Sequence, residues 1–121
     1  MNFQSYLKGF AAYLKLERSL SKHSIDAYLN DVDKLIQFYL ATEKELNLNQ
    51  ITLKDLREFI TWLNEIGMQS NTQARVISGL KAFFMYLLQE ENNKVEIKRA
   101  ASTILMIQFF SNVLNKLQFS A

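Results

Sequence analysis

The chain has 121 residues, of which 49% are hydrophobic, and it contains no cysteine and no proline. This length and composition fit one domain with a sizeable apolar core. The lack of cysteine excludes disulfides, thiol catalysis and cysteine-ligated metals, and it favours a cytoplasmic protein. The net charge of +2 does not by itself indicate a nucleic-acid partner. No apolar run reaches the ~18 residues of a membrane span, so no membrane partner is expected.

Apolar residues recur at helical spacing along the first part of the chain. The first expected helix covers about residues 2–18 and ends where the segment 19–21 interrupts the pattern. Ser21 is a favourable N-cap for a second helix over about residues 22–40. A polar connector is expected over residues 41–50.

Two capping boxes predict the starts of the next helices. Thr52 precedes Asp55 by three residues, and Gly67 is the expected left-handed residue at the end of this third helix. Ser70 precedes Gln73 by three residues in the same way, which predicts the start of a fourth helix. The residues from 76 to 88 form the strongest apolar stripe of the chain.

The segment from residue 95 onward is apolar on more than one side. We therefore divide the chain into a four-helix bundle at 1–94 and a tail at 95–121 that could form a fifth helix near 98–118. A helix that is apolar nearly all round requires burial on several sides. We expect a homodimer or higher oligomer in which residues 98–118 pack partly on another chain. The alternative is packing within one chain, with the remaining apolar side chains left at the surface.

The sequence offers little to an enzyme. His23 is the only histidine, so no metal site is expected, and the neighbouring Ser24 diverges from it on a helix. No glycine-rich phosphate loop is present. The acidic pairs at 43/45 and 90/91 lie in polar connectors and are interpreted as solvated surface. No catalytic residue, cofactor or small-molecule substrate is therefore predicted.

The outward face of the fourth helix favours contact with DNA. At ~100° per residue, Arg75 points away from the apolar stripe, with Asn71, Thr72, Ser78 and Gly79 around it. A helix in the major groove contacts bases from its N-terminal residues and needs small residues where the backbone comes close. Its free N–H groups can also hold a phosphate. The alternative interpretation is an ordinary solvated face.

The second helix has a comparable outward face. His23, Ala27, Asn30 and Lys34 share it, and Lys22 and Ser24 flank its start. The acids at 26, 31 and 33 are placed at the edges of this face, where they count against binding to phosphates.

Three segments resemble the N-terminal region of tyrosine recombinases of the Xer and phage-integrase branch. Residues 20–38 are similar to the pattern that opens the family's second helix, with Leu20, Ser21, Tyr28, Asp31 and Val32 at matching or similar positions. Residues 51–60 resemble the family's third helix, and residues 70–88 resemble its fourth. Together the matches cover about residues 1–94 in order and in register.

The resemblance implies an all-α, four-helix, SAM-like core-binding domain. In the family this domain forms one jaw of a clamp around duplex DNA, with its second and fourth helices facing the major groove. The faces derived from the residues alone are the same ones. The predicted DNA contacts, including the flanking lysine of the second helix, are Lys22, His23, Asn30, Lys34, Asn71, Thr72, Arg75, Ser78 and Lys81.

The sequence also departs from the family. It has no proline linker and no His-x-x-Arg motif, and its five tyrosines lie in the predicted helices of the binding domain. We therefore expect a DNA-binding module without a catalytic domain or strand cleavage. The alternatives are a protein-interaction module that dimerises and a truncated recombinase remnant without independent function. One continuous positive patch on the second and fourth helices would favour DNA, and intervening acids would favour the alternatives.

Overall fold

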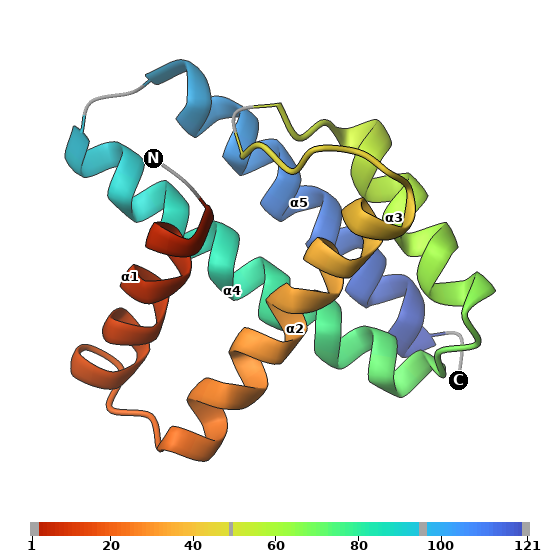
Figure 1. Ribbon diagram of the computed structural model, residues 1–121, viewed down its shortest axis with the longest axis horizontal. Coiled ribbons are helices and arrows are strands. Elements are labelled where there is room, and N and C mark those ends of the chain that lie inside the picture. The colour runs from red at the N-terminus through yellow and green to blue at the C-terminus, as the bar shows by residue number, and fades with distance from the viewer. Residues whose placement is uncertain (1–2, 49, 95–96, 120–121) are drawn as a thin grey trace.

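The computed structural model describes residues 3–48, 50–94 and 97–119, with the side chains of 91–102 and 118–119 left out of the description. These residues form five helices and no strand, as Figure 1 shows. The all-α prediction is confirmed, including the fifth helix. The helices are α1 (Phe3–Leu16), α2 (Lys22–Ala41), α3 (Leu53–Glu65), α4 (Ser70–Lys94) and α5 (Ile97–Phe119).

Three predicted helix ends are confirmed in atomic detail. The hydroxyl of Ser21 accepts a hydrogen bond from the backbone N–H of Ser24, which caps α2. The capping box of α3 is complete, because Thr52 and Asp55 each accept from the backbone N–H of the other. Gly67 follows α3 with a φ of +81°, the left-handed conformation that glycine adopts without strain.

The capping box predicted at the start of α4 is wrong. The helix begins at Ser70, but the side chain of Gln73 turns inward and is buried. Its amide donates to Oδ1 of Asn64 at 2.7 Å and to the carbonyl oxygen of Met68 at 2.8 Å. Gln73 thus joins α4 to the end of α3 and to the turn between them, because an inward amide must find buried acceptors.

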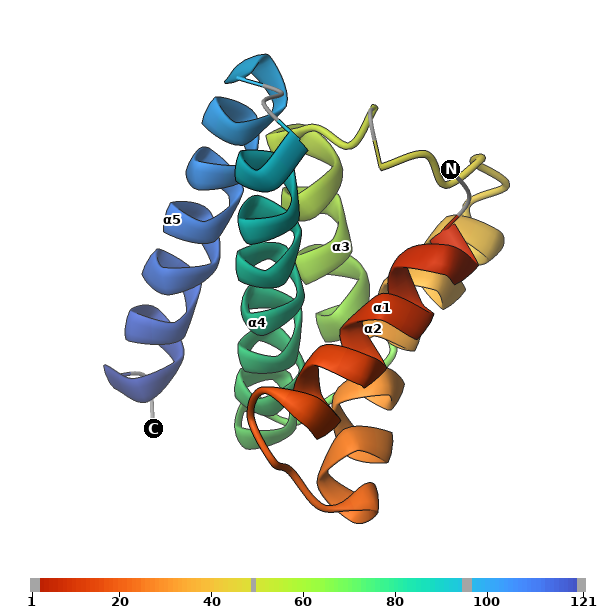
Figure 2. The same cartoon turned by 90° about the vertical axis from the view of Figure 1, so that its left-hand side faces the viewer.

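The fourth helix is the central element of the bundle. Figures 1 and 2 show α1 and α2 on one side of α4 and α5 on the other, and α4 contacts all three. Rings fill the space between α1 and α4, where the centroids of Phe10 and Phe83 are 5.2 Å apart. The fully buried apolar side chains from α1 to α4 include Phe10, Leu14, Val32, Leu35, Leu56, Phe59, Leu63, Val76, Ile77, Leu80 and Phe83.

The fifth helix runs antiparallel to α4 of the same chain (Figure 2). Met106 and Phe110 are buried against α4, and the ring of Phe110 lies 5.4 Å from that of Phe84. On the outer side, Ile104 and Leu105 remain 53% and 59% exposed. One face of the tail therefore packs within the chain, while its packing on a second chain stays a prediction.

The predicted domain boundary at 94/95 falls beside residues 95–96, which lie outside the described residues. The side chains of Lys98, Arg99 and Phe119 are likewise outside the described part. Among the helices that are described, none is long and apolar enough to cross a bilayer.

The close contact between α2 and α4 depends on Gly79. A Cβ atom at this position would lie 2.6 Å from Cβ and 2.9 Å from Cγ of Asp31, distances that real Cβ atoms do not adopt. Gly79 is buried and α2 crosses directly over it. The sequence interpretation, which placed this glycine on the outward face of α4, is therefore wrong. Its small size serves the contact between two helices.

Replacing Gly79 by alanine tests this contact. Alanine favours a helix by about 1 kcal/mol over glycine, whereas forcing extra atoms into a packed contact costs ~1–3 kcal/mol or more. We expect Gly79→Ala to lose roughly 1–2 kcal/mol of unfolding free energy in chemical denaturation, since the helices must move apart. Ser78→Ala, on the exposed face of the same turn, is the matched control and should change stability little. A Gly79→Ala protein that is as stable as the control would contradict the tight crossing.

Candidate nucleic-acid interface

The predicted residues of α2 lie along one accessible strip. Lys22, His23 and Asn30 are exposed, and Lys34 is half-buried. Burial raises the pKa of Asp31, and the charge of Lys34 is among those that partly oppose this rise.

The predicted residues of α4 occupy two different sides of the helix. Asn71, Arg75 and Ser78 are exposed, and Thr72 is half-buried. Lys81 follows Arg75 by six residues, which places it about 120° away around the helix, and it is half-buried. Lys81 therefore belongs to the flank of α4 and lies apart from the direction of Arg75.

The N-terminus of α4 is already partly occupied. Oδ1 of Asn71 accepts a hydrogen bond from the backbone N–H of Thr72 at 2.9 Å. This hydrogen bond removes one of the free backbone N–H groups that were expected to hold a phosphate at this end of α4.

The first halves of α2 and α4 meet around a pocket of about 220 Å³. Two of the nine predicted residues, Arg75 and Ser78, line it from α4. The remaining lining residues are small or polar, and the sequence analysis included none of them among the DNA contacts: Ser24, Ala27, Tyr28, Asp31 and Gly79.

An ion pair joins the two helices at this pocket. Nη1 of Arg75 lies 3.3 Å from Oδ1 of Asp31, with the side chain of Arg75 57% exposed and that of Asp31 only 6% exposed. Oδ1 is buried and accepts no hydrogen bond from the described residues. Burial raises the pKa of Asp31, and the nearby charges of Arg75 and Lys34 partly oppose that rise.

Asp31 is the functional-site residue that sequence reasoning placed wrongly. It was assigned to the exposed edge of α2, but it is buried where the helix crosses α4. The spacing contained the signal, because Tyr28, Asp31 and Leu35 recur at i, i+3 and i+7 on one helix face. An acid on such a face needs a cation and space opposite it. Arg75 and Gly79 supply them.

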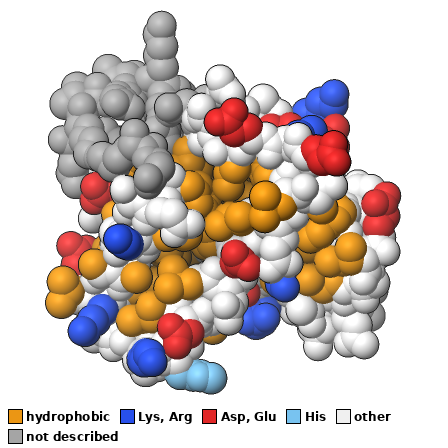
Figure 3. Space-filling view, viewed as in Figure 1, with side chains coloured by type: hydrophobic (Ala, Val, Ile, Leu, Met, Phe, Trp, Pro, Cys, Tyr) orange, Lys and Arg blue, Asp and Glu red, His pale blue; other side chains and the backbone are white. Residues whose placement is uncertain are grey.

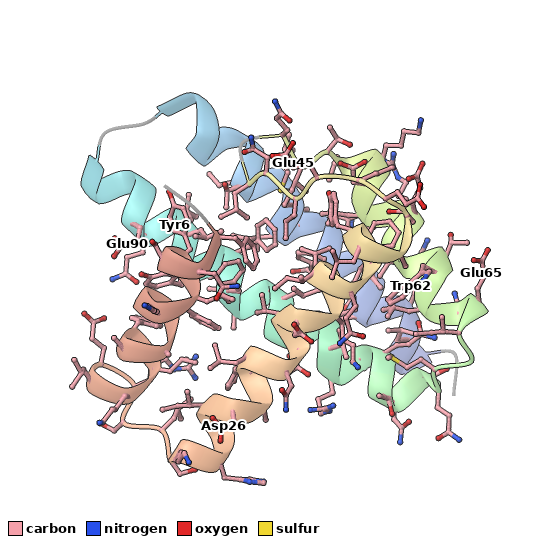
Figure 4. All side chains as sticks on the ribbon, viewed as in Figure 1. Tyr6, Asp26, Glu45, Trp62, Glu65 and Glu90 are labelled. Carbon is pink, nitrogen blue, oxygen red and sulfur yellow. The ribbon has the colours of Figure 1, made fainter. Side chains whose placement is uncertain are left out.

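The candidate surface is not uniformly basic. Asp26 and Asp33 are exposed on α2, and Figure 4 shows Asp26 in the first half of that helix. At ~100° per residue these two acids lie on the flank opposite Asp31, hence on the side away from α4. In Figure 3, basic, acidic and apolar side chains alternate across the visible face of the bundle. The positive charge is therefore interrupted, which is the arrangement that favours the protein-interaction alternative.

No group of three or more His, Cys, Asp or Glu side chains in the described part of the chain could hold a metal ion. Every tyrosine is buried or half-buried within a helix of the bundle.

Comparison with known proteins identifies relatives of this chain. The chain is 33% identical over 107 residues to tyrosine recombinase XerC of Listeria innocua, covering 85% of this chain and 35% of the relative. It is 31% identical over 90 residues to XerC of Anoxybacillus flavithermus, covering 74% of this chain and 30% of the relative. Tyrosine recombinase XerD of Vibrio cholerae is 27% identical over 88 residues, which cover 73% of this chain and 28% of the relative. The chain thus spans about a third of the length of these relatives.

No solved structure matches the chain significantly. The family profile described as "Phage integrase, N-terminal SAM-like domain" matches residues 7–91, which contain most of α1 and α4 and all of α2 and α3. Because this match covers most of the chain and includes the crossing of α2 and α4, the protein belongs to the phage integrase N-terminal SAM-like domain family.

Proposed function

We propose that the chain is the core-binding module of a tyrosine recombinase or integrase and grips duplex DNA in the cytoplasm through α2 and α4. The observation that carries the proposal is the junction of the two helices, where exposed Arg75 projects beside a pocket lined by both. The names of the relatives, tyrosine recombinases XerC and XerD, support a DNA partner. The proposed contacts are Lys22, His23, Asn30, Lys34, Asn71, Thr72, Arg75, Ser78 and Lys81.

The charges of the surface limit the strength of this binding. Affinity for duplex DNA depends mainly on how many phosphates the protein neutralises, because each releases condensed counterions. Few cations lie on α2 and α4, and Asp26 and Asp33 stand beside them. We propose a salt dependence equivalent to roughly three to six phosphates, with micromolar affinity or weaker.

The proposed role excludes strand cleavage by this chain. Transfer of a DNA strand to tyrosine needs an accessible phenol held among cations that stabilise the transition state. Each tyrosine here packs into the helical bundle, as when Tyr13 and Tyr86 place their rings 5.3 Å apart. The packing supports a structural role for these side chains.

Alanine substitutions on α2 test the phosphate contacts. We expect Lys22→Ala and Lys34→Ala each to lower the slope of log affinity against log salt by about one, because each removes one phosphate contact. Arg75→Ala should weaken binding more than Lys81→Ala, since Lys81 lies on the flank of α4. The measurement is a fluorescence-anisotropy titration of a mixed-sequence duplex at several salt concentrations.

Lys54→Ala provides the matched control, because it removes the same charge from α3, where Lys54 is 82% exposed. Figure 4 shows Trp62 and Glu65 on this helix, apart from the first half of α2. A protein that fails to bind duplex DNA at low salt would refute the proposed function. Equal losses from Lys54→Ala and Lys34→Ala would refute the assignment of the surface.

Exposed apolar side chains favour self-association as a second function. Ile104 and Leu105 on α5 and Met85 on α4 are each more than half exposed, and Met85 and Ile104 line an apolar hollow of about 360 Å³ between the two helices. Contiguous apolar surface of this kind is typical of contacts between proteins. We propose that α5 contributes to a homo-oligomer, in addition to its packing on α4.

The double substitution Ile104→Gln/Leu105→Gln tests this contact. Burying one such side chain stabilises a complex by ~1.5–3 kcal/mol, so the dissociation constant of the oligomer should rise at least about tenfold. Light scattering over a concentration series measures it, with Ile66→Gln, the same change at an exposed apolar residue after α3, as the control. A wild-type chain that stays monomeric throughout the series would contradict self-association.

A further inference from the structure

Asp31 is the one acidic side chain that is buried among those the structure describes. Removing a carboxylate from water is costly unless a cation and hydrogen bonds compensate it. Here Oδ1 accepts no hydrogen bond from any residue described, and the nearest compensating charge is Nη1 of Arg75 at 3.3 Å. The position therefore needs a reason other than the stability of the bundle, because an apolar residue would fill the crossing at lower cost.

The ion pair fixes one edge of the Arg75 guanidinium. An arginine has five N–H donors in a rigid planar fork, and one of its nitrogens is engaged by Asp31. More than half of the side chain still faces solvent. A surface arginine without such a partner samples many rotamers, whereas this one is restrained at its inner end and keeps donors free at its outer end. Such restraint lowers the entropy cost of a directional contact.

The carboxylate also changes which DNA group Arg75 can bind favourably. An arginine that only contacts phosphate gains from its full positive charge, and a carboxylate 3.3 Å away offsets that charge and repels the phosphate. The edge of a guanine is uncharged and offers two acceptors, N7 and O6, which match the arginine fork. The pair therefore favours a base edge over the DNA backbone.

The surroundings leave space for a base edge. A pocket of about 220 Å³ opens beside the pair, where Ala27 of α2 adds little bulk and Tyr28 forms part of the wall. The hydroxyl groups of Ser24 and Ser78 line it from the two helices.

We propose that Asp31 is a positioning residue that orients Arg75 to recognise a guanine in the major groove, which makes the pair a determinant of sequence preference. This inference rests on the proposed function, since it requires α2 and α4 to face DNA. It assigns Arg75 to a base and leaves the phosphates to lysines such as Lys22 and Lys34.

The test is a selection from duplexes with a randomised central segment, followed by sequencing of the bound fraction. Wild type, Arg75→Ala, Asp31→Asn and Asp33→Asn are compared. Asp33→Asn is the matched control, because it makes the same chemical change on the same helix at an exposed position. Circular dichroism melts verify that each variant is folded, and asparagine has the shape of the aspartate that it replaces.

We expect wild type to enrich guanine at one position and Arg75→Ala to lose that enrichment. Asp31→Asn should reduce it about fivefold or more, the range of one good bidentate contact, while its affinity for random duplex stays equal or rises. A structural role for Asp31 would not change one base position selectively. Asp33→Asn should keep the guanine preference.

Several results would overturn the inference: no base enriched by a wild type that does bind duplexes, a guanine preference retained by Arg75→Ala or Asp31→Asn, or an equal loss in Asp33→Asn. Failure of the wild type to bind any duplex would instead refute the proposed function. Should Asp31→Asn unfold, Asp31→Leu fills the crossing with an apolar side chain and leaves Arg75 without its partner. It should bind random duplex with equal or higher affinity and a reduced guanine preference, and a retained preference would overturn the inference.

Discussion

The crossing of α2 and α4 at Gly79 is the contact on which the candidate interface depends. A residue with no side chain lets the two backbones approach until the carboxyl group of Asp31 fills the remaining space. That approach brings the first halves of both helices to the same side of the molecule. It also leaves a charge buried between them, which Arg75 compensates from the opposite helix. Packing and charge therefore meet at this one point of the bundle.

The other sides of the fourth helix pack against the first and fifth helices. Phe83 faces α1, and Phe84 faces α5, where it contacts Phe110. Because α4 is covered by α1, α2 and α5, its outward strip is narrow and lies near its N-terminal end. The placement of α5 on the far side from α2 keeps this strip accessible (Figure 2). The core and the candidate site thus use different faces of a single helix.

Local sequence patterns predicted most of the helices and their ends, but they did not predict which side chains make contacts between different helices. Ser21, Thr52 and Gly67 mark helix ends through hydrogen bonds and backbone conformation within a few residues, so the sequence contains their whole cause. Gln73 was misassigned because its partner, Asn64, belongs to another helix. The same limit applied to Asp31, because its partners, Arg75 and Gly79, follow it in sequence by 44 and 48 residues. The direction of Arg75 was predictable from helical spacing, but its pairing was not.

A nuclear magnetic resonance titration of backbone amides with duplex DNA tests most directly whether α2 and α4 act as one binding surface. Signals from the first halves of both helices should shift together with increasing DNA, including those of residues 22–34 and 71–79. Signals of α3 and of the outer face of α5 should stay in place. Shifts that concentrate on α5 around Ile104 and Leu105, with α2 and α4 unchanged, would contradict the account and assign the partner to the opposite side of the bundle.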